Sequence, residues 1–342
     1  MTQRWKRRPA GSNWGEYGDD DEIGRLNLLG PNKVRQGLAE VKEGLTFCLS
    51  LPLDYPGGTV GNERRHPPRL FGAMAGGRCF HNFRLASQWP GTTAVVCDDA
   101  VLLSLQYSTQ WDSLAHVGAE FDADDDGIAE IVYYNGWRGG EHIVTPPPRE
   151  DAPDWARYEG VRAGALGIET MAATCVQGRG VMVDLATRFG REHRRVGYDD
   201  LMRIFDEDGI VIEEGDMVCF CTGFDNLLLE MDRQPDAKRM HGSCAGLDGS
   251  DDRLLQWVTD SGVAALISDN RAVEIMPPSP GARSSLHEHC LFKLGVPLGE
   301  QWYLSPLCNW LRARGRYRFM LTAPPLRLPG AAGSPVTPVA TV

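Results

Sequence analysis

The sequence lacks the features that would place the protein in a membrane or outside the cell. No apolar run approaches the ~20 residues that a membrane-spanning helix needs. The basic residues Arg4 to Arg8 are not followed by a hydrophobic stretch, so no secretory signal is predicted. The nine cysteines form no CxxC pair, and their odd number favours reduced thiols over a disulfide framework. We therefore expect a cytoplasmic protein with no membrane partner.

Positive charge is also scarce. Lys and Arg number 35 against 46 Asp and Glu, which gives a formal net charge of −11. Because phosphate-rich surfaces repel an acidic protein, this balance argues against nucleic acid as a partner. Hydrophobic residues make up 42% of the 342 residues, as in a globular protein and not a disordered one.

The chain divides into three predicted parts. Residues 1–30 are rich in Gly, Asp and aromatic residues and are predicted to form an irregular N-terminal arm. Residues 31–322 form the domain, and residues 323–342 are predicted as an extended C-terminal tail rich in Pro and Gly. Hydrophobic periodicity and capping residues predict helices at 31–44, 155–163, 168–175, 198–207 and 251–260. Strands are predicted at 45–53, 94–96, 101–106, 131–134, 180–185, 217–222 and 263–268, and residues 54–92 are predicted as a long loop.

Residues 101–116, VLLSLQYSTQWDSLAH, are predicted to be the centre of the molecule. An aliphatic run leads into Gln106, Ser108, Gln110 and Asp112, which alternate and would share one face of an extended chain. Four extended residues cover roughly 13 Å, so Gln106 and Gln110 reach one ion only if the backbone curls between them. Asp112 and His116 are four apart, which brings the two side chains together in a helical turn that Asp112 caps. The alternative is a polar strand end with a capped turn and a surface histidine.

A late helix offers further polar groups. Ser284 or Ser285 is predicted to cap it, with Glu288 completing a capping box, and Gly295 ends it. His287 on this helix and Glu300 after it are predicted to converge on one ligand position. His289 is predicted to lie at the surface or behind the site.

An acidic segment follows the central stretch. Asp122, Asp124, Asp126 and Gly127 match the first half of a calcium-binding loop, but Tyr133 stands where the bidentate Glu is expected. Residues Asp122 to Asp126 are therefore either a structural Ca²⁺ site or a β-turn in which aspartates cap backbone amides.

The segment Thr109-Gln110-Trp111-Asp112-Ser113-Leu114-Ala115-His116 resembles the signature of the cyclase family of metal-dependent hydrolases. That family includes kynurenine formamidase, isatin hydrolase and trans-dienelactone hydrolase, and its hallmark is H-x-G-T-H-x-D-x-P-x-H. Family-like stretches recur along nearly the whole chain, at Trp14-Gly15, Arg179-Gly180-Val181, Ser268-Asp269-Asn270 with Glu274, Leu294-Gly295 and Gly333-Ser334-Pro335. The resemblance implies a single-domain α+β swivelling β/β/α fold, assembled as a homodimer or homotetramer.

The same resemblance implies the site residues. The metal positions would be Gln106, Gln110 and Asp112, with His287 and Glu300 as further metal or site positions, and His116 would be the acid–base residue. Two family histidines are replaced by Gln106 and Gln110, and the family proline by Leu114. Because an amide offers a hard oxygen, the change favours Mn²⁺ over Zn²⁺, weak metal binding, or a site that works without metal.

Three functions remain open from the sequence. The first is a metal-dependent hydrolase in which activated water opens a cyclic amide, lactone or related carbonyl compound. The second is a metal-free lyase or cyclase that uses Asp112 and His116 as an acid–base pair. The third is a non-catalytic small-molecule binding protein that kept the fold.

Overall fold

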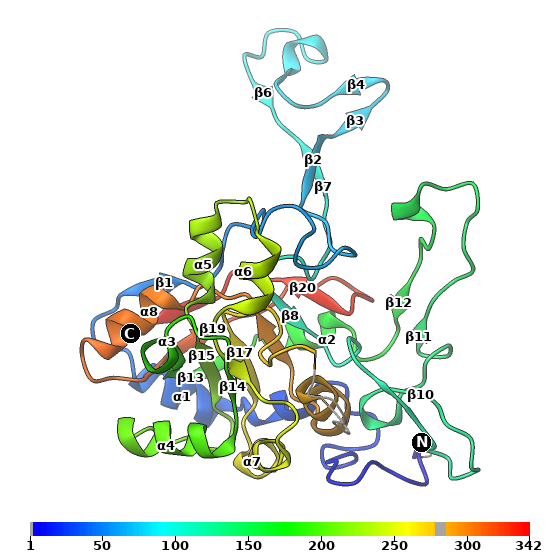
Figure 1. The fold of residues 1–342 in the computed structure, drawn as a ribbon. Coiled ribbons are helices and arrows are strands. Elements are labelled where there is room, and N and C mark those ends of the chain that lie inside the picture. Colours follow the sequence, from blue (N-terminus) through cyan, green and yellow to red (C-terminus); the bar gives the residue numbers. More distant parts are fainter. Residues whose placement is uncertain (1–2, 278–284) are drawn as a thin grey trace.

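A computed structural model describes residues 3–277 and 285–342. Its main feature is one nine-stranded mixed sheet, in the order β1-β21-β19-β13-β15-β17-β18-β8-β20. The four middle strands β13, β15, β17 and β18 are parallel to one another. Every other pairing within this nine-stranded sheet is antiparallel. Helices and loops cover the sheet, and two hairpin segments project from it (Figure 1).

The sheet strands and the other short strands have the following bounds: β1 (Thr46–Cys48), β2 (Arg69–Gly72), β3 (Met74–Ala75), β4 (Arg78–Cys79), β5 (Phe83–Arg84), β6 (Val95–Val96), β7 (Asp99–Leu102), β8 (Gln110–Asp112), β9 (Ala119–Phe121), β10 (Glu130–Val132), β11 (Ile143–Val144), β12 (Arg162–Ala163), β13 (Gln177–Asp184), β14 (Arg195–Val196), β15 (Met217–Cys221), β16 (Gly246–Leu247), β17 (Ala265–Ser268), β18 (Leu298–Glu300), β19 (Arg318–Thr322), β20 (Gly333–Pro335) and β21 (Val339–Thr341). The α-helices are α1 (Pro31–Ala39), α2 (Ile168–Ala173), α3 (Leu185–Phe189), α4 (Tyr198–Asp208), α5 (Phe224–Met231), α6 (Ala237–Gly242), α7 (Asp252–Ser261) and α8 (Ser305–Arg312). Four 3₁₀ turns, η1 (Gly24–Leu28), η2 (Leu85–Ser87), η3 (Tyr134–Gly136) and η4 (Asp154–Ala156), and the π-helical segment η5 (Glu288–Leu294) complete the list.

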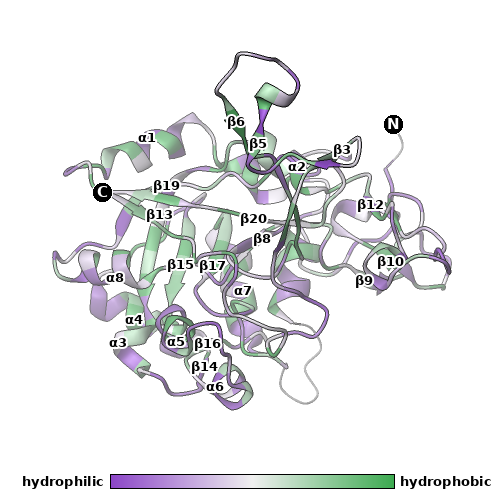
Figure 2. Ribbon diagram, turned by 90° about the horizontal axis from the view of Figure 1, so that it is seen from above, coloured by the Kyte–Doolittle hydropathy of each residue, from purple (hydrophilic) through white to green (hydrophobic). Residues whose placement is uncertain are grey.

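Period-two alternation along the parallel strands creates a core on each face of the sheet. On β15, Val218 and Phe220 face one core, whereas Met217, Cys219 and Cys221 face the other. Cys219 and Cys221 are therefore buried together on one face of this strand. The first core also takes apolar side chains of α4, α7 and η5, and the second takes those of α2 and α8. Accordingly, the central strands are hydrophobic and the outer helices carry hydrophilic residues (Figure 2).

Helix boundaries follow from local capping. The side chain of Asp251 accepts hydrogen bonds from the amides of Arg253 and Leu254 and so begins α7. Gly262 follows α7 and Gly209 follows α4, each in the left-handed conformation that glycine adopts without strain. Both helices lie where the sequence predicts them. Among the described residues, no helix combines the length and the apolar character that crossing a membrane requires.

The two ends of the chain pack on this sheet. Trp14, in the predicted N-terminal arm, is 1% exposed and donates from Nε1 to the carbonyl of Phe292 at 2.8 Å. Gly24 lies so close to Gly295 that a Cβ at either position would contact the other residue's backbone. The predicted extended tail contributes β20 and β21 to the sheet.

Several predicted elements are wrong. The strand expected at 101–106 ends at Leu102, and residues 105–109 form turns and bends, so Gln106 is not on an extended face with Asp112. The loop expected at 54–92 contains β2 to β5, and the strand expected at 45–53 is only β1. The helix expected at 155–163 is replaced by η4 and β12. These strands are two to four residues long, too short for alternation to reveal them.

The cysteine thiols supply a test of the packing. All nine are free: Cys219, Cys221, Cys244, Cys290 and Cys308 are buried, and Cys48, Cys79, Cys97 and Cys175 are exposed. Burial raises the pKa of Cys244 to about 12 and raises that of Cys219 further, which suppresses the reactive thiolate. We expect iodoacetamide at pH 8 to label the four exposed cysteines rapidly in the native protein and all nine in guanidinium chloride. Peptide mass spectrometry identifies the sites, and rapid native labelling at Cys219 would contradict the packing.

Candidate metal and catalytic site

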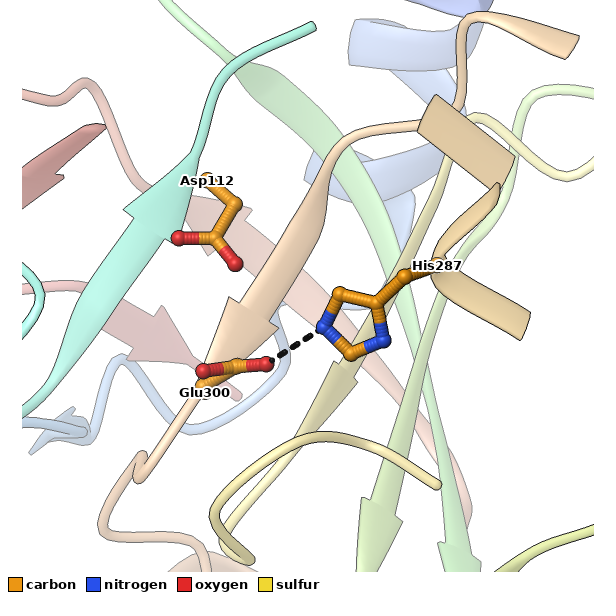
Figure 3. Close-up of side chains that lie close together, drawn as sticks. All are labelled: Asp112, His287 and Glu300. Atoms are coloured by element: carbon orange, nitrogen blue, oxygen red, sulfur yellow. Dashed lines mark hydrogen bonds and ion pairs between the residues drawn. The ribbon is translucent and has the colours of Figure 1, made fainter. Parts of the chain in front are cut away.

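Asp112, His287 and Glu300 come together from three separate segments of the chain. Asp112 ends β8, Glu300 ends β18, and His287 immediately precedes η5 (Figure 3). One ligand atom from each side chain lies within 4.8 Å of the others. Asp112 is 0% exposed and Glu300 is 1% exposed, so both carboxylates are held out of water.

Strand register places the two carboxylates on one face of the sheet. β8 and β18 are antiparallel, with Gln110 opposite Glu300 and Asp112 opposite Leu298. Directly opposite residues point to the same side, so Gln110, Asp112 and Glu300 share a face. Trp111 points to the other face, where its ring packs edge-on against Trp302 with the centroids 5.0 Å apart. The buried hydroxyl of Thr109 donates to the carbonyl of Gln301 at 2.6 Å, which fixes the bend before β8 against the end of β18.

Gln110 bridges the two carboxylates. Its Nε2 donates to Glu300 Oε2 at 2.7 Å and to Asp112 Oδ1 at 3.3 Å. Gln110 Oε1 and Asp112 Oδ2 are buried, and neither has a hydrogen-bond partner in the described part of the chain. Buried acceptors without partners are rare and costly. A divalent cation held by Asp112, His287 and Glu300 would satisfy Asp112 Oδ2, so the residues present fit a metal ion.

His287 is held between two carboxylates. Its Nδ1 donates to Glu274 Oε1 at 2.7 Å and its Nε2 donates to Glu300 Oε1 at 3.0 Å. Burial alone would lower the pKa of His287, but the hydrogen bonds to Glu274 and Glu300 outweigh it and raise the pKa to about 10. Glu274 also accepts the backbone amides of Leu286 and His287, which fixes the start of η5. A metal ion would take the place of the Nε2 proton, while the Nδ1 bond to Glu274 would hold the ring in position.

The predicted contact between Asp112 and His116 is present. The chain turns after β8, with the His116 amide bonded to the Ser113 carbonyl, and His116 Nε2 lies 3.6 Å from Asp112 Oδ2. Burial lowers the pKa of His116 to about 4, although the negative charge of Glu300 acts to raise it. Burial and the neighbouring Glu300 carboxylate raise the pKa of Asp112 well above its ordinary value. His116 is therefore neutral at pH 7, with a nitrogen free to accept a proton.

A cavity of about 450 Å³ opens beside these groups. Its lining includes His116, His287 and Glu300 and also three arginines. Its apolar walls come from Pro56, Val117, Met240 and Met276. This size falls within the range of small-molecule sites.

Other predicted positions have different surroundings. Gln106 lies on a turn, and its amide contacts Gly333, the β20 residue opposite Asp112. Its role as a ligand stays a prediction. Both carboxylate oxygens of Asp269 are already used, because they accept hydrogen bonds from the backbone amides of Thr222 and Gly223. His289 is buried behind the site and its Nε2 is 2.9 Å from Thr259 Oγ1.

The late helix is π-helical rather than α-helical. Leu286, Cys290 and Leu294, which are four residues apart, are all fully buried. Ser285 Oγ accepts the amide of Glu288 at 3.2 Å, in agreement with the predicted cap, and Ser284 lies outside the described residues. π-Helical turns frequently occur at functional sites.

In the acidic segment, three carboxylates gather. Asp122, Asp124 and Glu130 offer oxygens within 4.8 Å of one another. Asp122 accepts the amides of Asp126 and Gly127, as the capped-turn alternative predicts. Calcium binding here stays a prediction.

Two features of the site are not predicted by the sequence. Glu274 belongs to a family-like stretch, but its hydrogen bond to His287 is not predicted. The cavity arginines Arg64, Arg65 and Arg271 were not predicted at all. Arg64 and Arg65 lie in a segment expected to be loop, and Arg271 follows the strand-end pair Asp269-Asn270, which was the only available signal.

Comparison with known proteins identifies the family. The Cyclase family model, described as "Putative cyclase", matches residues 49–275, which is more than half of the chain. The chain therefore belongs to the cyclase family. A search of curated proteins finds no match.

Solved structures share the fold. A crystal structure described as a novel cyclase aligns with a TM-score of 0.72 at 28% identity, over 97% of this chain and 99% of that chain. Isatin hydrolase A from Labrenzia aggregata, bound to benzyl benzoate, aligns with a TM-score of 0.54 at 13% identity, over 90% and 97% of the two chains. Isatin hydrolase A from Ralstonia solanacearum aligns with a TM-score of 0.53 at 14% identity, over 86% and 91%. The predicted single-domain cyclase fold is confirmed.

Proposed function

We propose that this protein is a divalent-metal-dependent hydrolase that opens a cyclic amide, lactone or related carbonyl compound. The observation that carries the proposal is the buried cluster of Asp112, His287 and Glu300, with two unpartnered acceptor oxygens beside a cavity of about 450 Å³. The shared fold with isatin hydrolase A supports the choice of a cyclic amide.

Asp112, His287 and Glu300 would hold the ion, with the free oxygen of Gln110 and, as predicted from the sequence, Gln106 as further ligands. Two carboxylates and amide oxygens form a hard donor set, which favours Mn²⁺ over Zn²⁺. When bound, the ion would polarise the substrate carbonyl and lower the pKa of a water molecule.

The chain's own residues move the proton. His116 is neutral at pH 7 because burial lowers its pKa to about 4, so it accepts a proton at Nε2 from the attacking water. It then returns that proton to the leaving nitrogen or oxygen when the ring opens. Asp112, 3.6 Å away, orients the His116 ring and stabilises the transient imidazolium charge. Gln110 keeps the carboxylates of Asp112 and Glu300 apart, which preserves the site between them.

The test combines metal analysis with ring opening. The purified protein is analysed by mass spectrometry for bound metal, stripped with a chelator, and assayed on isatin and on a neutral six-membered lactone with and without added Mn²⁺. We expect turnover that disappears on chelation and returns with Mn²⁺. Full activity in the stripped protein would favour the metal-free lyase or cyclase. Ligand binding without turnover, unchanged by His116→Ala, would favour the non-catalytic binding protein.

Glu274 should matter for metal binding although it is not a ligand. Glu274→Gln removes the charged acceptor of the His287 Nδ1 hydrogen bond while keeping the shape of the side chain. We expect Mn²⁺ affinity to fall roughly 10- to 100-fold, because such partners orient ligand histidines. Titration calorimetry on the stripped protein measures the change, with the exposed Glu141→Gln as the matched control. Equal affinities in the two variants would contradict the orienting role.

We further propose that the enzyme is a cytoplasmic homodimer or homotetramer that assembles through the outer arm, residues 69–102. The nine free thiols support a reducing compartment. The outer arm stands away from the body of the molecule, and none of its residues is buried (Figure 1). Leu70 is 73% exposed, Met74 65% and Trp89 62%. Two-stranded hairpins of this kind are marginally stable alone, so a second copy of the chain is the expected cover.

Removing the outer arm should therefore reduce the mass of the particle. We expect replacement of residues 69–102 by a short Gly-Ser linker to convert the oligomer into a monomer, measured by light scattering after size exclusion. The double variant Leu70→Ser/Trp89→Ser should weaken assembly in the same direction without removing backbone. A monomeric wild-type protein, or a linker variant with unchanged mass, would contradict the assembly.

A further inference from the structure

Three arginines, Arg64, Arg65 and Arg271, line the same cavity as His116, His287 and Glu300. Arg65 Nη1 donates to the carbonyl of Gln106 at 2.8 Å and lies 3.9 Å from Glu300 Oε2, so its charge is paired with that carboxylate. Arg271 Nη1 donates to the carbonyl of Gly61 at 2.9 Å. Arg64 also lines the cavity, and its side chain is exposed.

Arg64 and Arg271 carry charges that the protein does not neutralise. Within residues 3–277 and 285–342, neither guanidinium lies at ion-pair distance from a carboxylate, although arginines such as Arg179 and Arg188 do so elsewhere. Burial lowers the pKa of Arg271, which shows that its charge is partly removed from water. A half-buried cation without an acidic partner is costly unless a ligand supplies the negative charge.

The rest of the cavity wall defines the remainder of that ligand. Pro56, Val117, Met240 and Met276 give the same cavity apolar surface. The cavity therefore has cationic, apolar and acidic lining residues. An anion is repelled by Asp112 and Glu300 and attracted by Arg64 and Arg271, so a molecule with one carboxylate and one neutral carbonyl is favoured with its carboxylate at the two arginines.

We propose that Arg64 and Arg271 form an anion subsite that binds a carboxylate on the substrate, with the reacting carbonyl turned toward Asp112, His287 and Glu300. That the bound molecule is a substrate rests on the proposed function. The subsite itself requires only that the ligand is an organic carboxylate. It narrows the substrate class to cyclic amides or lactones that carry an additional acidic group.

The binding test uses chelator-treated protein, so that no metal can bind the probe. Benzoate and its neutral analogue benzamide are titrated by calorimetry into the wild type and into Arg64→Met/Arg271→Met. We expect benzoate to bind the wild type more tightly than benzamide, and to bind the double variant roughly 10-fold or more weakly, because charged hydrogen bonds to carboxylates are strong. Benzamide binding should be unchanged in the double variant. Arg35→Met, which removes an exposed arginine of α1, is the matched control.

Two further variants guard against a folding defect. Arg271→Lys retains the charge and should keep part of the preference for benzoate, and Arg64→Met alone alters only an exposed side chain. Thermal unfolding reports whether each variant is folded. Equal affinities for benzoate and benzamide in the wild type, or unchanged benzoate binding in the folded double variant, would overturn the subsite.

The failure of this proposal is distinguishable from failure of the proposed function. Benzoate discrimination that depends on the arginines, in a protein with no metal-dependent turnover, supports the subsite and rejects the hydrolase. Metal-dependent ring opening of neutral lactones without arginine-dependent benzoate binding supports the hydrolase and rejects the subsite. If both hold, the ratio of kcat/KM for a carboxylated lactone over its neutral analogue should fall in the double variant.

Discussion

Asp112→Asn is expected to abolish metal-dependent turnover and to lower Mn²⁺ affinity on the order of 100-fold or more. The effect should exceed that of Glu274→Gln, because Asp112 is a proposed ligand whose charge is lost, whereas Glu274 only orients a ligand. Asp112 is fully buried, and its Oδ2 has no hydrogen-bond partner among the described residues. Asn keeps the shape of the side chain and an oxygen that can accept from Gln110, so the strand pairing of β8 should persist. Metal content after dialysis against Mn²⁺ and calorimetric titration measure the effect.

In the absence of metal, the same variant should be at least as stable as the wild type. The Asp112 carboxylate lies beside Glu300, and burial and that neighbour raise its pKa, which means that its ionised form is disfavoured in the folded protein. Removing the charge removes this repulsion, so chelator-treated Asp112→Asn should unfold at the same temperature as the wild type or higher. Asp260→Asn, on the exposed surface of α7, is the control and should change neither property. A variant with normal metal content, or one that loses metal only because it unfolds, would refute the assignment.

How far the sequence predicts this site depends on the distance between residues along the chain. The contact of Asp112 with His116 is local, and four-residue spacing was enough to predict it. The capped helices α4 and α7 and the alternating strand β15 are likewise local, since propensity and period decide them. The position of Glu300 opposite Gln110 depends on the register of β8 and β18, which are separated by most of the chain. The family resemblance grouped Glu300 with Gln110 and Asp112, but the pairing of β8 with β18 was not predicted.

Other parts were missed for physical reasons. The outer arm is built from hairpin strands of only two to four residues, separated by turns, so its sequence resembles loop. The role of Glu274 depends on its hydrogen bond to His287, 13 residues further along the chain. No periodic pattern in the sequence predicts such a contact. The arginines of the cavity could not be predicted because a solvated arginine and a cavity arginine have the same local sequence signal. Only the structure separates Arg271, which has no acidic partner among the described residues, from Arg179, which has one.

Asp216 gives the second large effect, this time on stability. It is fully buried just before β15 and accepts from Lys33 Nζ at 3.0 Å and from Arg179 Nε at 2.9 Å, two cations that are themselves buried. It thereby joins α1 to β13 and β15. Asp216→Asn removes the carboxylate partner of Lys33 and one of the two carboxylate partners of Arg179, whose other partner is Glu213 at 3.0 Å, and we expect it to lower the free energy of unfolding by about 3–5 kcal/mol. Asp206→Asn, exposed on α4, should have little effect.

A second substitution separates the charge from the packing. If the loss in Asp216→Asn arises from the uncompensated buried charge of Lys33, then adding Lys33→Met removes that charge and should recover part of the stability. If the loss arises only from disturbed packing, the double variant should be less stable than either single variant. Thermal unfolding of the four proteins at one pH distinguishes the two cases. Because the network lies on β13 and β15 and not on β8 or β18, Mn²⁺ affinity measured below the unfolding transition should be equal in all four. A common loss of metal binding would show that the order of the site depends on this buried charge network.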